Sequence, residues 1–269
     1  MATTGLTTFL FGYNLEKIVY PWREAIASAL PISDQVIFCE CFSEDNTWAE
    51  VQQLAAKEPK LLLTRHPWGN HYTIQSFISN HCLRLVQTPW VLKLDADECI
   101  HHDSYSKFVN ELRQIEMASI KGCRPHYTHF TPDFDTTFPF IYDRKATVVY
   151  LPYGWHFGTG YKEDACEFTY QHRPPVVDVS LEIYHYGKVQ TGRRREALHK
   201  ELDFTALYTE LGFPDRIVVK QSETTGVIDY NEVFQVAKAR GLFQPFTNTH
   251  PQAMLPYIER MKAREAAGQ

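Results

Sequence analysis

The 269-residue chain lacks the features that mark secreted and membrane-spanning proteins, and it has no overall basic charge, which leaves only a local basic patch for binding a polyanion. Its six cysteines are scattered and form no CxxC pair, which indicates reduced thiols in a cytoplasmic protein rather than a disulfide framework. No segment reaches the roughly 18 uncharged apolar residues of a membrane helix, and the start of the chain lacks the positive charge of a secretory signal. The net charge of −5 gives no overall attraction to nucleic acid or an anionic membrane. We therefore expect a cytoplasmic protein that is not an integral membrane protein.

The chain does have a regular alternation of short apolar runs and amphipathic stretches over about its first hundred residues. Helical patterns over 16–30, 43–58 and 71–86 separate four apolar runs that are expected to be strands. Strands joined through helices need crossover connections, which predicts an α/β fold with a mainly parallel sheet flanked by helices. The four strand candidates are TTFLFGY (7–13), QVIFCECF (35–42), KLLLTR (60–65) and WVLKLDA (90–96).

The second half of the chain is less regular. The stretch from Cys123 to Tyr170 is rich in aromatic residues, Pro, Gly and His, so strands and functional loops are expected at one sheet edge. A basic helical stretch and a helical tail follow, and no linker separates them from the rest. We predict one domain over 1–190, with a C-terminal helical extension over 191–269 packed on the same domain.

The strongest local signal is the acidic sequence DADE, which directly follows a buried strand. Side chains two residues apart on an extended strand point to the same side, so Asp95 and Asp97 can converge on one point. Ligands of open α/β sheets bind beyond the carboxyl ends of the strands, and two carboxylates there suit a hard divalent cation that also binds phosphates. The alternative is that these acids only end the strand and cap the next helix. His101 and His102, which follow, are interpreted as polar loop residues.

A second strand candidate also carries an acid at its end. Glu40 lies in the apolar run IFCECF, where an unpaired carboxylate is costly, and a polar turn then leads into a helix. Two acid-tipped strands beside a helix N-terminus are typical of a nucleotide-diphosphate pocket, in which Glu40 accepts hydrogen bonds from a base or ribose. For Ser43 and Asp45 in the turn, we favour helix capping.

Together these segments resemble the family 2 glycosyltransferases of the GT-A fold, over about the first hundred residues. The S-x-D-x-T turn of that family is matched by Ser43, Asp45 and Thr47, and its DxD motif by Asp95 and Asp97. The resemblance implies a Rossmann-like GT-A domain over 1–190 in which the two aspartates hold Mn²⁺ or Mg²⁺ against a sugar-nucleotide diphosphate. Glu40 and Cys41 replace the family's more usual acidic pair, which leaves the donor nucleotide open.

The resemblance also implies a catalytic base. In GTGYKEDACE, Glu163 and Asp164 are similar to the family's x-E-D element, whose last acid deprotonates the acceptor. A hydroxyl nucleophile gains from a positioned base, and attack opposite the leaving diphosphate inverts the anomeric centre. Asp164 is the predicted base, with Glu163 and Glu167 as alternatives; a solvated loop is the other interpretation.

Further site residues follow from the same resemblance. His185, in IYHYG, is the expected third metal ligand, although a core histidine bonded to a carbonyl is the alternative. Arg193 and Arg195, with Arg194 between them, are expected to fold over the diphosphate and stabilise the leaving-group charge, and a solvated helix face is the alternative. Tyr13 and Arg65, at or after the ends of the first and third strand candidates, are expected near the nucleotide.

The predicted function is metal-dependent, inverting transfer of a sugar from a nucleotide-diphosphate donor to a hydroxyl acceptor. The acceptor stays open among a glycan, a lipid-linked sugar and a modified nucleobase, as in DNA. A nucleotidyltransferase is the alternative enzyme, but FLFGYNLEK lacks the Gly-rich basic phosphate loop that such enzymes usually carry. A non-catalytic carbohydrate- or nucleic-acid-binding module on the same fold is the alternative outside the enzymes.

Overall fold

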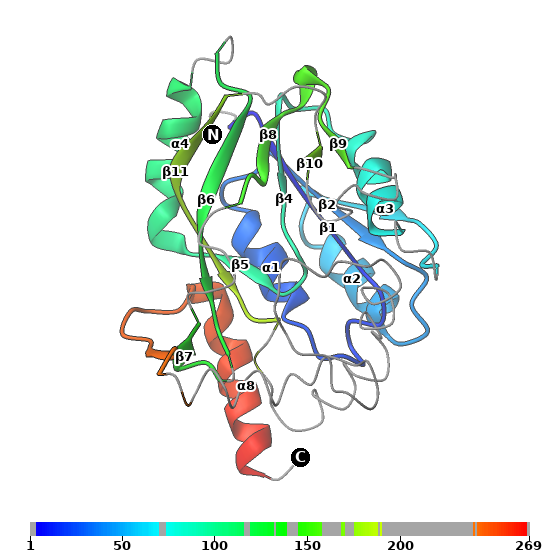
Figure 1. The fold of residues 1–269 in the computed structure, drawn as a ribbon. Coiled ribbons are helices and arrows are strands. Elements are labelled where there is room, and N and C mark those ends of the chain that lie inside the picture. Colours follow the sequence, from blue (N-terminus) through cyan, green and yellow to red (C-terminus); the bar gives the residue numbers. More distant parts are fainter. Residues whose placement is uncertain are drawn as a thin grey trace, which may run out of the picture.

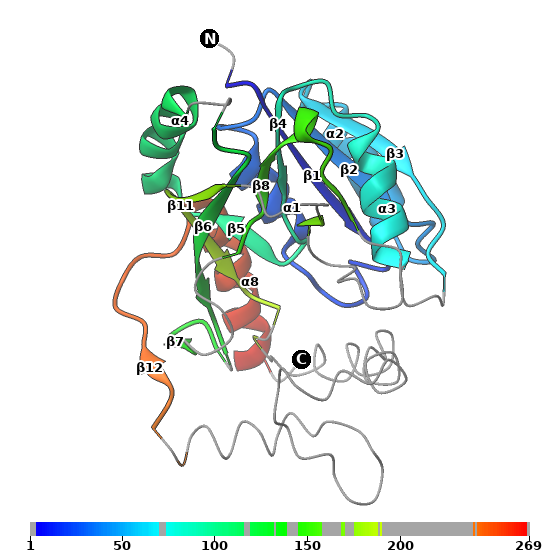
Figure 2. The ribbon, with the colours of Figure 1, turned by 45° about the horizontal axis from the view of Figure 1, so that its top comes forward.

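A computed structural model describes residues 4–69, 74–115, 119–131, 133–138, 145–157, 168–169, 175–187, 189, 239 and 241–267. Its centre is an eight-stranded sheet in the order β3-β2-β1-β4-β8-β6-β11-β5 (Figures 1 and 2). The strands are β1 (Leu6–Gly12), β2 (Gln35–Glu40), β3 (Leu61–Arg65), β4 (Trp90–Lys93), β5 (Glu98–Ile100), β6 (Gly122–His129), β8 (Val148–Tyr150) and β11 (Val176–His185).

The four strands expected in the first hundred residues are present and pair in parallel, as predicted. The rest of the sheet is mixed, because β8 pairs antiparallel with β4 and β6, and β5 pairs antiparallel with β11, whereas β6 and β11 are parallel. Antiparallel neighbours need no crossover helix, which agrees with the irregular second half of the sequence. The sheet is therefore an α/β sheet with a parallel half and a mixed half.

Helices cover both faces of this sheet (Figure 2). Among the helices that the structure describes, none has the length and apolar character needed to cross a membrane. The helices are α1 (Trp22–Ala29), α2 (Thr47–Ala55), α3 (Ile74–Leu83), α4 (Tyr105–Gln114) and α8 (Leu255–Ala266), with short 3₁₀ turns at 102–104, 151–153 and 252–254. Four two-residue strands, β7 (Thr136–Thr137), β9 (His156–Phe157), β10 (Phe168–Thr169) and β12 (Gln244–Pro245), pair as β10-β9 and β12-β7.

Side-chain alternation divides the core into two layers. On β1, Leu6 and Leu10 belong to the cluster that includes residues of α1, α4 and α8, whereas Phe9 belongs to the cluster with α3. On β2, Phe38 belongs to the first of these clusters and Ile37 to the second. Strands buried on both faces read as continuous apolar runs, which explains why the sequence pattern identified them.

The first helix is shorter than its pattern over 16–30 predicts. It begins at Trp22, directly after Pro21, and Val19 has a left-handed backbone with φ of 56°. A proline disfavours helical geometry in the residue before it, so the chain turns at Tyr20 and the helix starts beyond the ring. The preceding segment is a loop that reaches toward α2.

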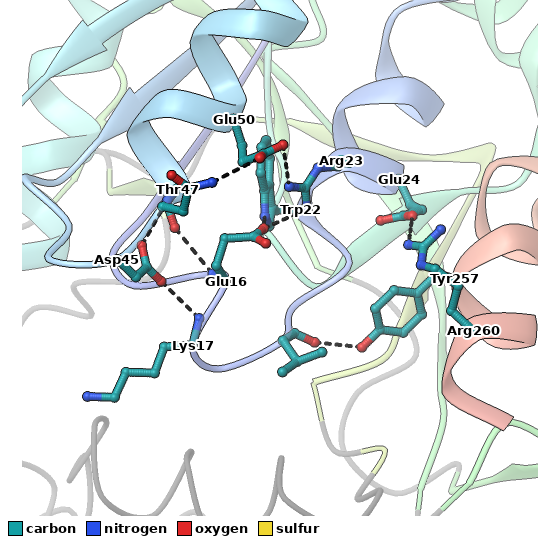
Figure 3. A network of polar contacts seen from close by, with 12 residues as sticks. Glu16, Lys17, Trp22, Arg23, Glu24, Asp45, Thr47, Glu50, Tyr257 and Arg260 are labelled. Atoms are coloured by element: carbon teal, nitrogen blue, oxygen red, sulfur yellow. Dashed lines mark hydrogen bonds and ion pairs between the residues drawn. The ribbon is translucent and has the colours of Figure 1, made fainter. Parts of the chain in front are cut away.

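Polar contacts hold that loop against the start of α2 (Figure 3). Arg23 donates to Glu16 (Nη1–Oε1, 2.6 Å) and to Glu50 on α2 (Nη2–Oε2, 3.0 Å). Asp45 accepts from the backbone N–H of Lys17 (2.9 Å) and from that of Thr47, the first residue of α2 (2.9 Å), although the N-cap position itself is Asn46. These contacts fix the two loops that follow β1 and β2.

The C-terminal helix α8, part of the predicted extension over 191–269, packs on the domain beside α1 (Figures 1 and 3). Arg260 forms an ion pair with Glu24 of α1 (Nη2–Oε1, 2.6 Å), and the hydroxyl of Tyr257 donates to the carbonyl of Val19 (2.6 Å). Tyr257 and Met261 are buried in the same core cluster as α1. The tail helix thus shares the core of the sheet domain.

Candidate functional site

The strand register brings the predicted donor residues to one edge of the sheet. Gly12 of β1 lies opposite Glu40 of β2, which in turn lies opposite Arg65 of β3. β4 ends beside β1 at Lys93, and Asp95 follows after one residue, Leu94. Tyr13, the first residue after β1, completes the row. The carboxyl ends of four parallel strands therefore meet at the kind of sheet edge where α/β proteins bind ligands.

Glu40 is fully buried and its carboxylate is held by internal partners. Arg65 forms an ion pair with it (Nη2–Oε2, 2.6 Å), and the backbone N–H groups of Phe42 and Ser43 donate to its two oxygens. The Arg65 guanidinium lies between the rings of Phe42 (4.0 Å to the centroid) and Trp48 (4.4 Å). Glu40 thus organises the turn after β2, and a direct contact from Glu40 or Arg65 to a nucleotide stays a prediction.

Tyr13 stacks on Trp68, with ring centroids 5.6 Å apart and nearly parallel planes. The loop that follows Tyr13 is fastened to the turn after β2, because the N–H of Asn14 donates to the Ser43 hydroxyl (2.9 Å) and the Asn14 side chain accepts from Glu44 N–H (2.8 Å). Tyr13 and Trp68 therefore place a flat aromatic pair at the same sheet edge.

Asp97 and His185 meet although 88 positions separate them in the sequence. β11 pairs with β5 so that His185 lies opposite Glu98, and Tyr186 N–H donates to the Asp97 carbonyl (2.9 Å). His185 Nε2 and Asp97 Oδ2 are 3.5 Å apart. A Cβ at Gly187 would lie 2.1 Å from Asp97 Oδ2, so only glycine leaves room for this approach.

His129, a residue that the sequence interpretation missed, orients His185. Their Nδ1 atoms are 2.9 Å apart, and His129 is buried on β6, the parallel neighbour of β11. One of the two nitrogens must carry the hydrogen. With the hydrogen on His185 Nδ1, His185 Nε2 on the Asp97 side is the unprotonated nitrogen that a metal requires. No motif marks His129, because its position depends on strand pairing.

Asp95 is paired with a buried lysine. The ammonium of Lys93, whose side chain is only 3% exposed, contacts Asp95 Oδ1. Burial alone would raise the pKa of Asp95, but the positive charges of Lys93 and Lys145 outweigh it and lower that pKa to about 2. Asp95 is therefore ionised at neutral pH. The sequence signal that could have revealed this pair is Lys93 itself, a charged residue inside the apolar run WVLKLDA and two positions before Asp95.

Glu98, the last acid of DADE, is buried at the start of β5. Its Oε2 accepts from the backbone N–H of Asp95 (3.0 Å). Burial and the negative charge of Asp95 raise the pKa of Glu98 to about 7. The three acids of DADE therefore have different roles, since Asp95 is paired with lysine, Asp97 faces His185 and Glu98 supports the turn.

The Asp97–His185 pair fits a divalent cation. Two atoms that share one ion at about 2.1 Å each lie roughly 3–3.5 Å apart, which matches the Oδ2–Nε2 distance of 3.5 Å. The ligand atoms of Asp95, Asp97 and His185 are not all within 4.8 Å of one another, whereas in the described part of the chain those of His101, His102 and Asp103 are. Asp97 and His185 thus offer two ligand atoms at a suitable spacing, whereas Asp95 is turned to Lys93.

The group at 101–103 has the side chains that bind metals, and it also attaches the C-terminal segment. His101 Nε2 lies 3.0 Å from the carbonyl of Thr249, and His102 Nδ1 accepts from the N–H of Gln252 (3.2 Å). The imidazoles therefore position the chain that leads into α8. His101 and His102, which the sequence indicated only as polar loop residues, thus have a structural role in attaching the C-terminal segment.

The remaining predicted residues lie outside the described part of the chain. They are the candidate bases Glu163, Asp164 and Glu167 and the diphosphate-binding candidates Arg193 and Arg195. Their roles stay predictions that rest on the resemblance of the sequence.

The family model of glycosyl transferase family 2 matches residues 13–166, more than half of the chain. The chain therefore belongs to this family. The match includes Tyr13, Glu40, the DADE motif and two of the three candidate bases, Glu163 and Asp164. No curated protein matches the chain.

Solved structures of S. aureus TarS show a distant likeness. TarS 1–349 is 14% identical with a TM-score of 0.47, over 68% of this chain and 60% of that one. Its complex with UDP-GlcNAc is 15% identical with a TM-score of 0.47, over 77% of this chain and 65% of that one. The chain thus spans about three fifths of the TarS 1–349 length.

Proposed function

We propose that the protein transfers a sugar from a nucleotide-diphosphate donor to a hydroxyl acceptor, with inversion and with the help of a divalent cation. Membership of glycosyl transferase family 2 supports the reaction class. The observation that carries the metal dependence is the Asp97–His185 pair, whose facing ligand atoms are 3.5 Å apart beside the carboxyl ends of the parallel strands.

The residues have distinct proposed tasks. Asp97 and His185, with Asp95 of the same motif, hold Mn²⁺ or Mg²⁺, which when bound supplies positive charge to the leaving diphosphate. Tyr13 contacts the nucleotide from the loop after β1, where it stacks on Trp68. Glu40 and Arg65 support that pocket through their ion pair.

Acceptor activation is assigned from the sequence alone. Asp164 is the proposed base that takes the proton of the acceptor hydroxyl, with Glu163 and Glu167 as alternatives, and Arg193 and Arg195 are proposed to bind the diphosphate. A glycan, a lipid-linked sugar and a modified nucleobase all offer the hydroxyl group that this chemistry needs.

A ligand screen tests the donor class. We expect one of UDP, GDP, CDP, ADP and dTDP to raise the thermal unfolding midpoint, and to do so only with Mn²⁺. A ligand that binds only the native state stabilises it by about 2.7 kcal/mol at 100 times its Kd. Equal stabilisation with and without Mn²⁺ contradicts metal dependence, and no stabilisation by any nucleotide favours the non-catalytic module.

His129→Phe is expected to weaken Mn²⁺ binding about 10- to 100-fold, because it removes the partner that sets the tautomer of His185. Mn²⁺ affinity is measured by titration of the protein followed by electron paramagnetic resonance of the free ion. His126→Phe is the matched control on the same strand, since His126 lies opposite Glu182 rather than His185. An equal loss in both variants would mean that His129 acts only through the fold of β6.

A further inference from the structure

We propose that Lys93 is a built-in counter-ion that competes with a divalent cation for the carboxylate of Asp95. In the free protein, Asp97 and His185 then provide most of the metal affinity. This inference rests on the proposed function. It adds Lys93 to the proposed metal site as a residue that acts through Asp95.

The ion pair between Lys93 and Asp95 is unequal in exposure. The side chain of Lys93 is 3% exposed and that of Asp95 is 38% exposed. A buried ammonium without a partner is costly, whereas a carboxylate that reaches water is not. The ammonium of Lys93 is therefore kept from water beside Asp95, whereas the Asp95 carboxylate remains accessible to water and to a second cation.

The strand also keeps Lys93 in place. Lys93 is the last residue of β4, and it lies two positions after Val91, which packs in the α3 layer of the core. Its ammonium lies 5.8 Å from the centre of the Phe11 ring, a favourable position for a cation. The side chain of Lys93 thus lies on the apolar α3 side of the sheet, and its ammonium reaches Asp95, the first acid of the DADE motif.

A fixed positive charge beside a carboxylate weakens its attraction for a second cation. Asp95 is in that situation, with Lys145 adding to the positive charge around it. Asp97 instead faces the imidazole of His185, whose Nε2 lies 3.5 Å from Asp97 Oδ2. The two aspartates of one DxD motif therefore differ in their availability to a metal, although the sequence presents them as equivalent.

Mn²⁺ binding to the protein without nucleotide tests this directly. Lys93→Met removes the charge and keeps the length of the side chain, so we expect Mn²⁺ to bind roughly tenfold more tightly or better. Lys60→Met is the matched control, because Lys60 caps carbonyls of Leu30 and Ser33 at the start of β3, away from Asp95. Unchanged or weaker Mn²⁺ binding in Lys93→Met would overturn the proposal.

A second variant separates competition from a general effect on the fold. Asp95→Asn introduced into Lys93→Met should remove the gain in affinity, because the gain is made through Asp95. A gain that persists in the double variant contradicts the proposal.

Two further variants complete the test. Lys93→Arg keeps the positive charge and should keep the weak Mn²⁺ binding of the natural protein. Lys93→Gln replaces Lys93→Met if circular dichroism shows that Lys93→Met is unfolded. Because the readout is the binding of Mn²⁺ alone, these results stand whether or not sugar transfer is found.

Discussion

Asp97→Asn is expected to reduce sugar transfer by about 10²- to 10³-fold, the size of effect seen when one electrostatic contact to the transition state is removed. Asparagine keeps the shape of the side chain but loses the charge that faces His185 Nε2 at 3.5 Å. The backbone carbonyl of residue 97 still accepts from Tyr186, so the turn is retained. The thermal unfolding midpoint should therefore stay nearly unchanged while Mn²⁺ binding is lost.

Asp178→Asn is the matched control for this variant. Asp178 lies on β11, the strand that carries His185, and pairs with Arg124 in an exposed position. The same chemical change there should leave transfer and Mn²⁺ binding intact. If Asp97→Asn unfolds the protein, the aspartate is structural; if it retains full transfer, the metal site lies elsewhere.

Arg65→Met is expected to lower the free energy of unfolding by about 3 kcal/mol. The change leaves the fully buried carboxylate of Glu40 with its backbone donors but without its counter-ion. The guanidinium also fills the space between Phe42 and Trp48, and Phe42 has a left-handed backbone with φ of 56° that this packing supports. Urea unfolding followed by circular dichroism measures the loss.

Arg23→Met provides the comparison, since Arg23 also bridges carboxylates. Its partners Glu16 and Glu50 are about one third exposed, so the expected cost is only about 0–1 kcal/mol. Equal costs at the two positions would mean that burial of Glu40 does not govern the energy of its ion pair. The comparison thus tests the supporting role of Glu40 and Arg65 independently of any ligand.

The first half of the fold could be predicted from sequence because its signals are local. Strands buried on both faces appear as apolar runs, and parallel neighbours bring their carboxyl ends to one edge, so Glu40, Arg65 and Asp95 were expected together. Proline chemistry explains why the first helix starts at Trp22 rather than near residue 16.

The rest of the site depends on pairing between distant strands. The parallel alignment of β6 with β11 places His129 beside His185, and no spacing in the sequence encodes that alignment. The burial of Lys93 had a local signal, because a charged residue inside an apolar strand must find a partner on its own side. Asp95, two residues further along, was predicted only as a metal ligand, and its ion pair with Lys93 was missed.

The central claim, metal-dependent use of a nucleotide-sugar donor, is tested most directly by release of nucleotide diphosphate from a panel of nucleotide sugars. The reaction is followed with water as the substitute acceptor, with Mn²⁺ and with a chelator. We expect release from one donor, only with Mn²⁺, and its loss in Asp97→Asn. Release that is equal with the chelator, or equal in Asp97→Asn, would contradict the account.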